Sequence, residues 1–596
     1  MRRYPVFFAL LFLALFFLTI LVPMKSQTNK QRVEISFQMP NASVCVNYFF
    51  VGNTPCVAYL SQGDLISIEW KNLQIDYIYS KSESLFFEIS RNSFLMNGSL
   101  FGVQATDMIP GDIQKEKIQY VFLKGELTPN LINQLAELSS LKILRIPEVS
   151  DQGLQYLKAL PKVVSINLGR DSYHLLVPQI SDTGLEHLKW LINLSSLDLR
   201  GTEISDSGLA CLKNLVNLTS LRLSDIPISD SGLVCLKDLV NLSSLDLSGT
   251  RISDSGLVCL KDLVNLSHLN LGETQISDIG IRFLEKCIRL FYFDLHSTRI
   301  GDKGLENIKF FTALSTLSLE ATQISNNGLK YLKGLRGLSS LNLSLTRING
   351  TGLKQLQELT NLSTLNLGAT WITDNDLCYL KLFPQLSALF LYKTMISDSG
   401  LIYLKSLTTL RLLNLNDTKI SDVGLSYLKD LTDITYLDIS GTRINPYFNI
   451  QPRISNVGIE YLRGLTKLFY LNLARTGINN IGLKYLKEMP HLCYLNLDQT
   501  RISADGLKYL VELNNLRCLN LSMTLTGDEG VMYIGNLASL SCLELLGTKI
   551  SDDSLLYLAA SPKLSYLDLK QNTISNAAIK KFKQKKPFCF ILHTSK

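Results

Sequence analysis

Residues 242–265 are LSSLDLSGTRISDSGLVCLKDLVN, and residues 266–289, LSHLNLGETQISDIGIRFLEKCIR, repeat that pattern position for position. Apolar pairs of the form Leu-x-Leu recur in the same way along most of the chain. They begin at Leu144, Ile166, Leu197, Leu221, Leu245, Leu269, Phe293, Leu317, Leu341, Leu365, Leu389, Leu413, Leu437, Leu471, Leu495, Leu519, Leu543 and Leu567. From Leu197 to Leu437 the spacing is 24 residues without a slip. A fixed period of this length indicates a stack of repeated units.

Each unit has the pattern L-x-x-L-x-L-x-x-T-x-I-S-D-x-G-L-x-x-L-x-x-L. Its first part alternates, which predicts a strand with one buried face. Ser-Asp follows, and these residues can cap the free N–H groups at the start of a helix. Leucines three residues apart, such as Leu257, Leu260 and Leu263, then give the helix one apolar stripe. A single unit cannot bury its apolar face, so we expect the units to stack.

This pattern resembles the leucine-rich repeat family, with Thr250 and Thr274 where the family usually has Asn or Cys. The I-S-D-x-G-L-x-x-L segment is similar to the cysteine-containing subclass and, more closely, to the Thr-bearing repeats of bacterial surface-type proteins. The resemblance implies an α/β solenoid, a horseshoe with a parallel sheet inside and helices outside. It also implies binding, generally of protein. A threonine hydroxyl can still bond to the backbone of the turn, so we expect each coil to survive this change.

Three regions follow from this division of the chain. Residues 116–596 form the predicted solenoid of about twenty coils, with IQYVFLKG as a degenerate first strand and FCFILH as a closing strand. Residues 27–115 contain short β-rich runs between Gly, Asn, Pro and Ser, which predicts a small β domain that caps the first coil. Residues 1–26 form a targeting segment.

That targeting segment has Arg2 and Arg3 ahead of an apolar run at residues 6–22. The run is at the lower edge of the length that spans a bilayer, and no small-residue cleavage site follows it. We favour an uncleaved signal-anchor over a cleaved signal peptide. Either segment predicts that the rest of the chain is extracytoplasmic, held at the membrane or secreted.

Composition argues against several classes of function. The formal net charge is +7 with both signs mixed along the chain, so we do not expect a nucleic-acid partner. No catalytic triad order, phosphate loop, zinc motif or glycine fingerprint stands out, and we expect no catalytic residue, metal or cofactor. In an oxidising compartment, Cys45 and Cys56 are a candidate disulfide.

The inner face of the predicted sheet is where side chains vary freely. Aromatic and aliphatic residues gather there on the strands from Leu389 to Leu495, with one more residue on the preceding rim. The predicted ligand-binding residues of this patch are Trp371, Phe390, Tyr392, Leu412, Tyr436, Tyr470 and Tyr494. Exposed aromatic clusters are typical of interface hot spots. The alternative is that these side chains only pack against one another and stabilise the sheet.

An insertion beside this patch adds candidates. The segment NPYFNIQPR, residues 445–453, enters between strand and helix and contributes Tyr447, Phe448 and Arg453. Long loops on a rigid scaffold commonly carry function. A competing polar cluster, His268, Asn270, Tyr292, Asp294, His296 and Glu320, lies on successive inner strands. It has nothing to shield it from water, so a polar surface is favoured over a metal or acid–base site.

The sequence therefore predicts a non-enzymatic, membrane-anchored binding protein that displays its repeats outside the cytoplasm. The expected partner is a protein, with a cell-surface glycan as the alternative. Two other functions remain open: a structural or adhesive surface protein, and an intracellular ligase-type substrate receptor if the apolar N-terminus is not a targeting segment.

Overall fold

The computed structural model describes residues 118–123, 126–170, 180–441, 453–587 and 589–594, together with the backbone of strands between residues 31 and 105. The chain divides into two compact units, residues 1–342 and 343–596. The apolar segment at residues 6–22 lies outside the described residues. Within the described ones, no helix combines the length and the apolar character needed to cross a membrane.

Unit 1 begins with short strands that form two sheets. These strands are β1 (Gln31–Phe37), β2 (Ser43–Val46), β3 (Phe49–Asn53), β4 (Cys56–Leu60), β5 (Leu65–Trp70), β6 (Leu73–Ile78), β7 (Ser84–Ser90), β8 (Ser93–Met96) and β9 (Ser99–Ala105). One sheet has the order β3-β2-β5-β6. In the other, β4 pairs with β1, β1 with β7, β7 with β8 and β8 with β9. Strand β9 then pairs in parallel with the first coil strand, so it covers an edge that would otherwise be open.

The coils of unit 1 contribute parallel strands that pair in sequence order. They are β10 (Tyr120–Leu123), β11 (Ile143–Arg145), β12 (Ser165–Asn167), β13 (Ser196–Asp198), β14 (Ser220–Arg222), β15 (Ser244–Asp246), β16 (His268–Asn270), β17 (Tyr292–Asp294), β18 (Thr316–Ser318) and β19 (Ser340–Asn342). The central leucine of each strand pairs directly with that of the next, as Leu221 does with Leu245. The degenerate first strand is confirmed as β10.

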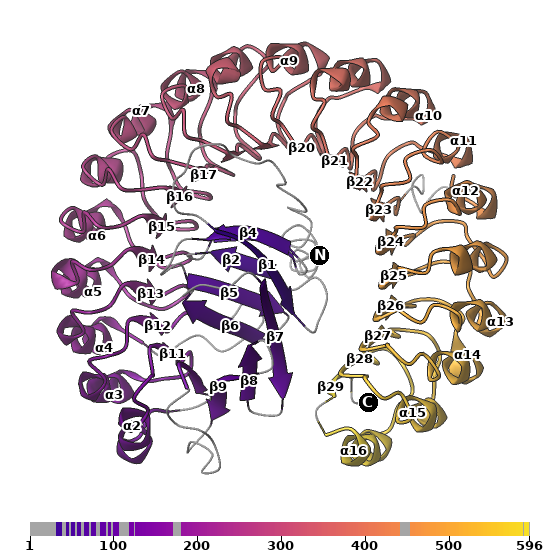
Figure 1. The fold of residues 1–596 in the computed structure, drawn as a ribbon, viewed down its shortest axis with the longest axis horizontal. Coiled ribbons are helices and arrows are strands. Elements are labelled where there is room, and N and C mark those ends of the chain that lie inside the picture. Colours follow the sequence, from indigo (N-terminus) through magenta and orange to yellow (C-terminus); the bar gives the residue numbers. More distant parts are fainter. Residues whose placement is uncertain are drawn as a thin grey trace. The chain divides into compact units, whose positions relative to one another are not determined.

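Unit 2 has the same organisation. Its strands are β20 (Thr364–Asn366), β21 (Ala388–Phe390), β22 (Leu412–Asn414), β23 (Tyr436–Asp438), β24 (Tyr470–Asn472), β25 (Tyr494–Asn496), β26 (Cys518–Asn520), β27 (Cys542–Glu544), β28 (Tyr566–Asp568) and β29 (Phe590–Leu592). Strand β29 pairs in parallel with β28 and closes the array, as predicted. In both units the strands lie along one edge and the helical turns along the other (Figure 1).

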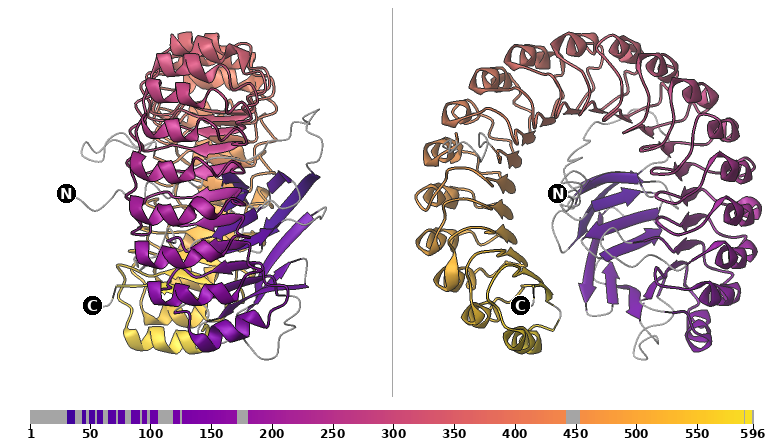
Figure 2. Two further views of the ribbon diagram at one scale, coloured as in Figure 1. Left: turned by 90° about the vertical axis from the view of Figure 1, so that its left-hand side faces the viewer. Right: turned by 180° about the vertical axis from the view of Figure 1, so that it is seen from behind.

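The helical side of unit 1 is built from short α-turns and 3₁₀ turns. They are α2 (Pro129–Ala136), α3 (Asp151–Leu154), η2 (Gln155–Ala159), α4 (Asp182–Leu185), η3 (Glu186–Trp190), α5 (Asp206–Leu209), η4 (Ala210–Asn214), α6 (Asp230–Leu233), η5 (Val234–Leu236), η6 (Gly256–Leu260), α7 (Asp278–Ile281), η7 (Arg282–Leu284), α8 (Asp302–Ile308) and η8 (Gly328–Gly334). In the side view of Figure 2 these turns lie one above another in a single layer.

Unit 2 continues the same mixture. Its helical elements are α9 (Gly350–Gln355), η9 (Asp374–Leu382), α10 (Asp398–Leu401), η10 (Ile402–Ser406), α11 (Asp422–Leu425), α12 (Asn456–Leu462), η12 (Gly482–Glu488), α13 (Ala504–Leu507), η13 (Lys508–Leu510), α14 (Gly527–Ile534), α15 (Asp552–Leu558) and α16 (Asn576–Lys585). The helical segments predicted for the coils are present, as short α-turns and 3₁₀ turns. Leucines three residues apart, such as Leu257 and Leu260, match the 3.0-residue turn of a 3₁₀ helix better than the 3.6-residue turn of an α-helix.

The threonine that most units carry at this position is a buried structural residue. In one coil the Thr250 hydroxyl donates to the carbonyl of Leu247 at 2.6 Å, and in another Thr500 donates to Leu497 at 2.6 Å. Both side chains are buried. The expectation that a threonine can replace the usual asparagine by bonding to the turn is confirmed.

Aspartate side chains link most of the described coils to the next, and Asn456 and Asn480 take this place in two coils. The Asp230 carboxylate accepts from the backbone N–H of Ser253 at 2.7 Å and from its hydroxyl at 2.5 Å. The same pair of bonds joins Asp398 to Ser421. Because each carboxylate lies against the glycine of the next coil, a Cβ on Gly256 would sit 2.5 Å from Asp230 Oδ1. Sequence inspection assigned Ser-Asp to capping within one coil and missed this aspartate ladder between coils.

Candidate binding surface

Four of the predicted patch residues form one row on the sheet of unit 2. Leu412 on β22 pairs directly with Tyr436 on β23, which pairs with Tyr470 on β24, and Tyr470 pairs with Tyr494 on β25. The backbone register thus places their side chains in line on one face of the sheet. The structure therefore brings these four residues together as the sequence predicted.

The three tyrosines form a continuous stack, here called the tyrosine ladder. Ring centroids of Tyr436 and Tyr470 are 4.0 Å apart, and those of Tyr470 and Tyr494 are 4.3 Å apart, with 8° between the planes in both pairs. These separations are shorter than the roughly 4.8 Å between neighbouring strands, so the rings lean together. Offset stacking of this kind stabilises the sheet beyond simple burial.

The three tyrosines are largely buried, so the expectation that they form an exposed aromatic patch was wrong. Only 6% of Tyr436 and 8% of Tyr470 is exposed, and Tyr494 is half-buried. Burial raises the pKa of all three phenols well above the usual tyrosine value. Rings stacked on adjacent strands cover each other's faces, and this leaves little aromatic surface for a partner. The sequence showed which residues share the face, but ring packing decided their exposure.

The remaining predicted strand residues are buried as well. Phe390 on β21 pairs with Asn414 in a second row and is 1% exposed. Tyr392, two residues later, is 7% exposed, and Leu412 is 2% exposed. The prediction that Phe390, Tyr392 and Leu412 are exposed to solvent was therefore wrong as well. Whether any of them contacts a ligand remains a prediction.

Beside the tyrosines on the same face, buried polar groups satisfy one another. The Asp438 carboxylate on β23 accepts from the Ser440 hydroxyl at 2.6 Å, the Ser440 backbone N–H at 3.0 Å and the Asn472 amide at 3.0 Å. Burial raises the pKa of Asp438, and the hydrogen bonds from Ser440 and Asn472 oppose that rise. These bonds occupy much of the acceptor capacity of Asp438, so the geometry favours a structural role over acid–base work.

Trp371 behaves differently, because its side chain is 62% exposed. It lies on the rim between strand β20 and turn η9, at a position that is Arg or Lys in several other coils, such as Arg347 and Lys419. Leu345 on the previous coil and Met395 on the next are 50% and 54% exposed. Backbone bonds join the three coils: the N–H of Trp371 donates to Ile348 at 3.0 Å, and the N–H of Met395 donates to Ile372 at 3.3 Å.

We call Leu345, Trp371 and Met395 together the Trp371 rim. Sequence reasoning found Trp371 but missed its two neighbours. Met395 could have been found, because it replaces a residue that is basic in other coils. Leu345 was harder to find, because it occupies a left-handed turn position with φ of 57°, where residues of many types occur from coil to coil. The exposed apolar surface thus lies at the edge of the sheet instead of on its face.

Basic side chains flank this rim. Arg347 and Lys419 are exposed at its two ends, and Arg453 lies beyond Lys419. One guanidinium nitrogen of Arg453 donates to the carbonyl of Lys419 at 2.8 Å, which places the end of the insertion on the same rim as Trp371. The predicted residues Tyr447 and Phe448 lie outside the described residues. Trp, Met and Arg are the residue types enriched at the centres of protein interfaces.

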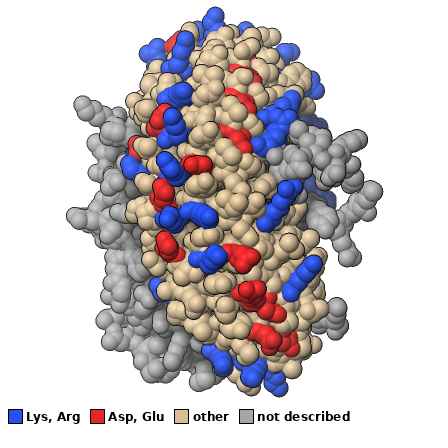
Figure 3. All heavy atoms as spheres, turned by 90° about the vertical axis from the view of Figure 1, so that its right-hand side faces the viewer, with Lys and Arg blue, Asp and Glu red and all other residues tan. Residues whose placement is uncertain are grey.

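The helical face of the molecule offers a weaker alternative. In Figure 3, Lys and Arg side chains alternate with Asp and Glu over the face turned to the viewer. Interspersed charges of both signs create no extended field that would draw in a charged partner. The edge that carries Trp371 is therefore the more specific candidate.

The polar cluster in unit 1 forms an ion triad. His296 Nδ1 lies 3.0 Å from Asp294, and its Nε2 lies 3.5 Å from Glu273. The Asp294 carboxylate raises the pKa of His296 to about 11, so the ring is an imidazolium at neutral pH. An imidazolium has no lone pair for a metal or a proton. Among the described residues, no three His, Cys, Asp or Glu side chains are grouped to hold a metal.

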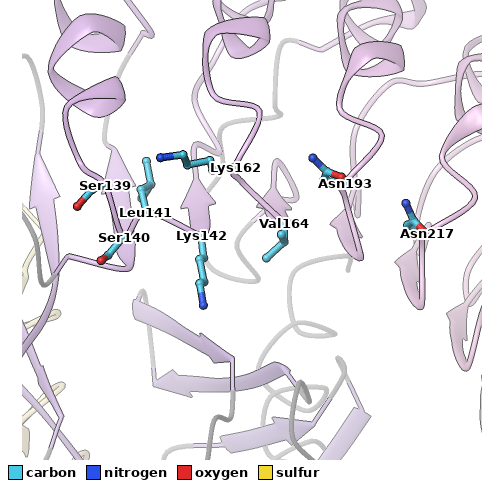
Figure 4. Close-up of a pocket in the computed structure, with 8 residues that line it drawn as sticks. All are labelled: Ser139, Ser140, Leu141, Lys142, Lys162, Val164, Asn193 and Asn217. Atoms are coloured by element: carbon cyan, nitrogen blue, oxygen red, sulfur yellow. The ribbon is translucent and has the colours of Figure 1, made fainter.

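Two further candidates add little. Cys45 lies on β2 and Cys56 on β4, in different sheets, and their side chains lie outside the described residues, so the disulfide stays a prediction. A shallow hollow is lined by Ser139, Ser140, Leu141, Lys142, Lys162, Val164, Asn193 and Asn217 (Figure 4). In that view the amino groups of Lys142 and Lys162 point in different directions, so they do not converge on an anion.

Comparison with solved structures finds many repeat proteins. An internalin from Listeria monocytogenes is 24% identical over 62% of this chain and 93% of its own, with a TM-score of 0.39. A leucine-rich-repeat protein from Leptospira interrogans is 19% identical over 77% of this chain and 91% of its own, with a TM-score of 0.37. The TLR13–ssRNA13 complex is 22% identical over 78% and 67%, with a TM-score of 0.49.

A search of curated protein sequences finds no match. The family model described as "Leucine Rich repeat" matches residues 191–213, 239–261 and 406–429. These segments cover the helix end, strand and turn of coils whose geometry recurs throughout both units. The family model thus identifies leucine-rich repeats in these three segments of the chain.

Proposed function

We propose that this chain is a non-enzymatic binding protein that recognises a protein partner through the Trp371 rim. The observation that carries the proposal is the exposure of Leu345, Trp371 and Met395 on three consecutive coils. Isolated exposed apolar residues need no explanation, but a contiguous group with basic neighbours is typical of an interaction site. A cell-surface glycan, which could stack on Trp371, is the alternative ligand.

The proposed setting is extracytoplasmic, with the apolar segment at residues 6–22 as the membrane anchor. Two positive residues before that segment and the lack of a cleavage site after it support an uncleaved anchor. Sequencing the N-terminus of the mature protein tests this: Met1 or Arg2 supports the anchor, and a start near Gln27 means a cleaved signal.

The test of the binding surface replaces Trp371 and Met395 with arginine, a residue that the same column carries at Arg251 and Arg347. The double variant therefore has a sequence that the fold already accepts. We expect capture of the partner from cell-surface extracts by the full chain to fall at least about 30-fold, because two central anchors are lost. Purified glycans in parallel separate the two ligand classes.

A matched control changes the same column in unit 1, with Arg251 and Arg299 replaced by glutamine. This variant alters charge on a rim position without touching the Trp371 rim. Capture should be unchanged. Equal capture by the wild type, the arginine double variant and the control, with all three folded by circular dichroism, would remove the Trp371 rim as the site.

A further inference from the structure

A row of exposed aliphatic side chains runs along one edge of unit 1. Ile192, Val216, Val240, Val264 and Ile288 occupy the same position in five consecutive coils, between the helical turn and the strand, and are 43% to 59% exposed. Trp190 and Phe310 lie near its two ends, 66% and 56% exposed. We call these seven residues the unit 1 stripe. It is the longest exposed apolar row among the described residues.

The fold does not require apolar side chains at this position. Equivalent positions in unit 2 include Thr360, Thr408 and Thr432, which are exposed in coils of the same geometry. Threonine has nearly the same shape as valine but carries a hydroxyl. Since water is the natural neighbour of an exposed position, the change to five consecutive aliphatic residues indicates a contact outside the described chain.

Side-chain hydrogen bonds between neighbouring coils fix the positions of the stripe residues. The amide of Asn217 donates to the carbonyl of Ile192 at 2.8 Å, that of Asn241 to Val216 at 2.9 Å, and that of Asn265 to Val240 at 2.9 Å. The coils of unit 1 form a single layer in the side view of Figure 2. Equivalent positions along such a layer form a level edge, and a flat surface can touch all of them at once.

Charge around the stripe is mainly positive. The two columns before it and the one after it contain Lys189, Lys213, Lys237, Lys261, Lys286, Arg289 and Lys309, against Asp238, Asp262 and Glu285. Lys286 lies 2.8 Å from Asp262 and offsets its charge. The Lys189 ammonium lies 5.4 Å from the centre of the Trp190 ring, and that of Lys309 lies 5.0 Å from the Phe310 ring.

We propose that the unit 1 stripe rests on the surface of an anionic phospholipid bilayer. Aliphatic residues would enter the boundary between headgroups and acyl chains, Trp190 would lie at the headgroup level, and the lysines would face lipid phosphates. This contact uses residues far along the chain from the predicted anchor and from the Trp371 rim. It orients unit 1 with one edge on the membrane and its strand face to the side.

The test measures contact at the stripe itself. The full chain is mixed with vesicles of equal parts phosphatidylcholine and phosphatidylglycerol, with and without bromine on the acyl chains. Bromine quenches tryptophan only at close range, and Trp190 is one of three tryptophans. Because the N-terminal segment can hold every variant on the vesicle, local quenching is the readout instead of the amount bound.

We expect W190F to remove most of the quenchable emission, and W371F to leave it in place. Replacing Val216, Val240 and Val264 with threonine should reduce quenching at least threefold. The matched control replaces Val234 and Val258 with threonine. Both are exposed on the helical turns of the same unit, and this variant should leave the quenching unchanged. Quenching should also fall on vesicles of phosphatidylcholine alone.

Any of three outcomes of the quenching experiment would overturn the proposal. These are quenching that survives the threonine substitutions, quenching that is equal on neutral vesicles, or no quenching of Trp190 at all. If the stripe instead joins two copies of the chain, the threonine variant would lower the sedimentation coefficient without vesicles, which also refutes a membrane contact. Loss of protein capture in the Trp371 rim variants with quenching intact would show that the two surfaces act separately.

Discussion

Strands β13 to β15 and strands β23 to β25 have the same backbone and carry opposite kinds of inner face. Ser196, Ser220 and Ser244 pair directly across the first set, as Tyr436, Tyr470 and Tyr494 do across the second. Behind both rows the leucines are fully buried and the register is unbroken. The comparison teaches that the buried columns build the coil, while the inner row can change from hydroxyl to phenol without altering it.

The next row on the same face, two residues along each strand, also differs. Near the serines, Arg222 lies 3.8 Å from Asp198 and 3.2 Å from Asp246, so charges hold that part of the face together. Near the tyrosines, ring stacking and the hydrogen bonds from Ser440 and Asn472 to Asp438 serve the same purpose. Each region therefore stabilises its own inner face by a different interaction, and the predictions below separate what is local from what all coils share.

Loss of the central ring should have the largest effect. Tyr470→Ser removes a buried aromatic side chain and both stacking contacts, and we expect the free energy of unfolding of unit 2 to fall by about 3 kcal/mol. Ser220→Ala at the matching position in unit 1 should cost well under about 1 kcal/mol. Denaturant titration of both variants checks this, and similar losses would mean that the tyrosine ladder adds nothing.

The threonine column should matter equally in both regions. Thr250→Val and Thr500→Val each remove the hydroxyl hydrogen bond to a buried carbonyl, and we expect a cost of about 1.5 kcal/mol for each variant. Thermal unfolding monitored by circular dichroism would measure both. A cost confined to one region would show that this column is not part of the common scaffold.

The aspartate ladder should have a smaller effect and a pH dependence. Asp230→Asn and Asp398→Asn each weaken one link between coils, at a cost of about 1 kcal/mol. For Asp151 in unit 1, burial raises the pKa, but hydrogen bonds from Ser181 outweigh it and leave the pKa lowered. For Asp528 in unit 2, burial also opposes, and bonds from Ser551 and Ser554 lower the pKa.

These lowered values fix the direction of the pH effect. A carboxylate whose pKa is depressed in the folded state contributes stability that is present above its unfolded pKa, near 3.8. That stability is lost as the pH falls through the lower, folded value. Unfolding midpoints measured from pH 6 down to pH 2 should therefore fall in both units as Asp151 and Asp528 become protonated. A flat profile would contradict the ladder.

The smallest effect concerns the left-handed turn. Gln499 has φ of 55° and occupies the column that Gly249 fills with φ of 67°. Gln499→Gly should raise the free energy of unfolding by about 0.5 kcal/mol, because glycine adopts this conformation without steric cost. Gly249→Ala should lower it, since the new Cβ would lie 2.4 Å from Asp225 Oδ1. Changes of opposite sign in the free energy of unfolding would show that glycine is favoured at this turn in both units. Changes of the same sign would show that the two turns differ.

Periodicity predicted most of the fold. The 24-residue spacing located the strands, and the degenerate IQYVFLKG and FCFILH segments were correctly included as β10 and β29. What periodicity could not supply was the partner of each polar side chain. The Asp230 carboxylate reaches Ser253 in the next coil, and only the three-dimensional spacing of coils shows that.

Exposure was the least predictable property of the candidate site. Strand alternation correctly assigned Tyr436 and Tyr470 to one face, but their mutual stacking, which depends on the distance between strands, buried them. Trp371 was predicted and is exposed because it lies on the rim, where no neighbouring strand covers it. A search for columns in which a usually basic position turns apolar would have found Met395 from sequence alone.

The aspartate ladder has a consequence for how such a gene can change length. Most of the described links have the same polarity, with a donor serine on the later coil and an acceptor aspartate on the earlier one, as in Asp206 with Ser229 and Asp230 with Ser253. Removing or copying one whole coil between two such links leaves a junction of the same kind, with no orphaned carboxylate or serine. Among these coils, copy number can therefore change by recombination while the chemistry of the joints stays constant.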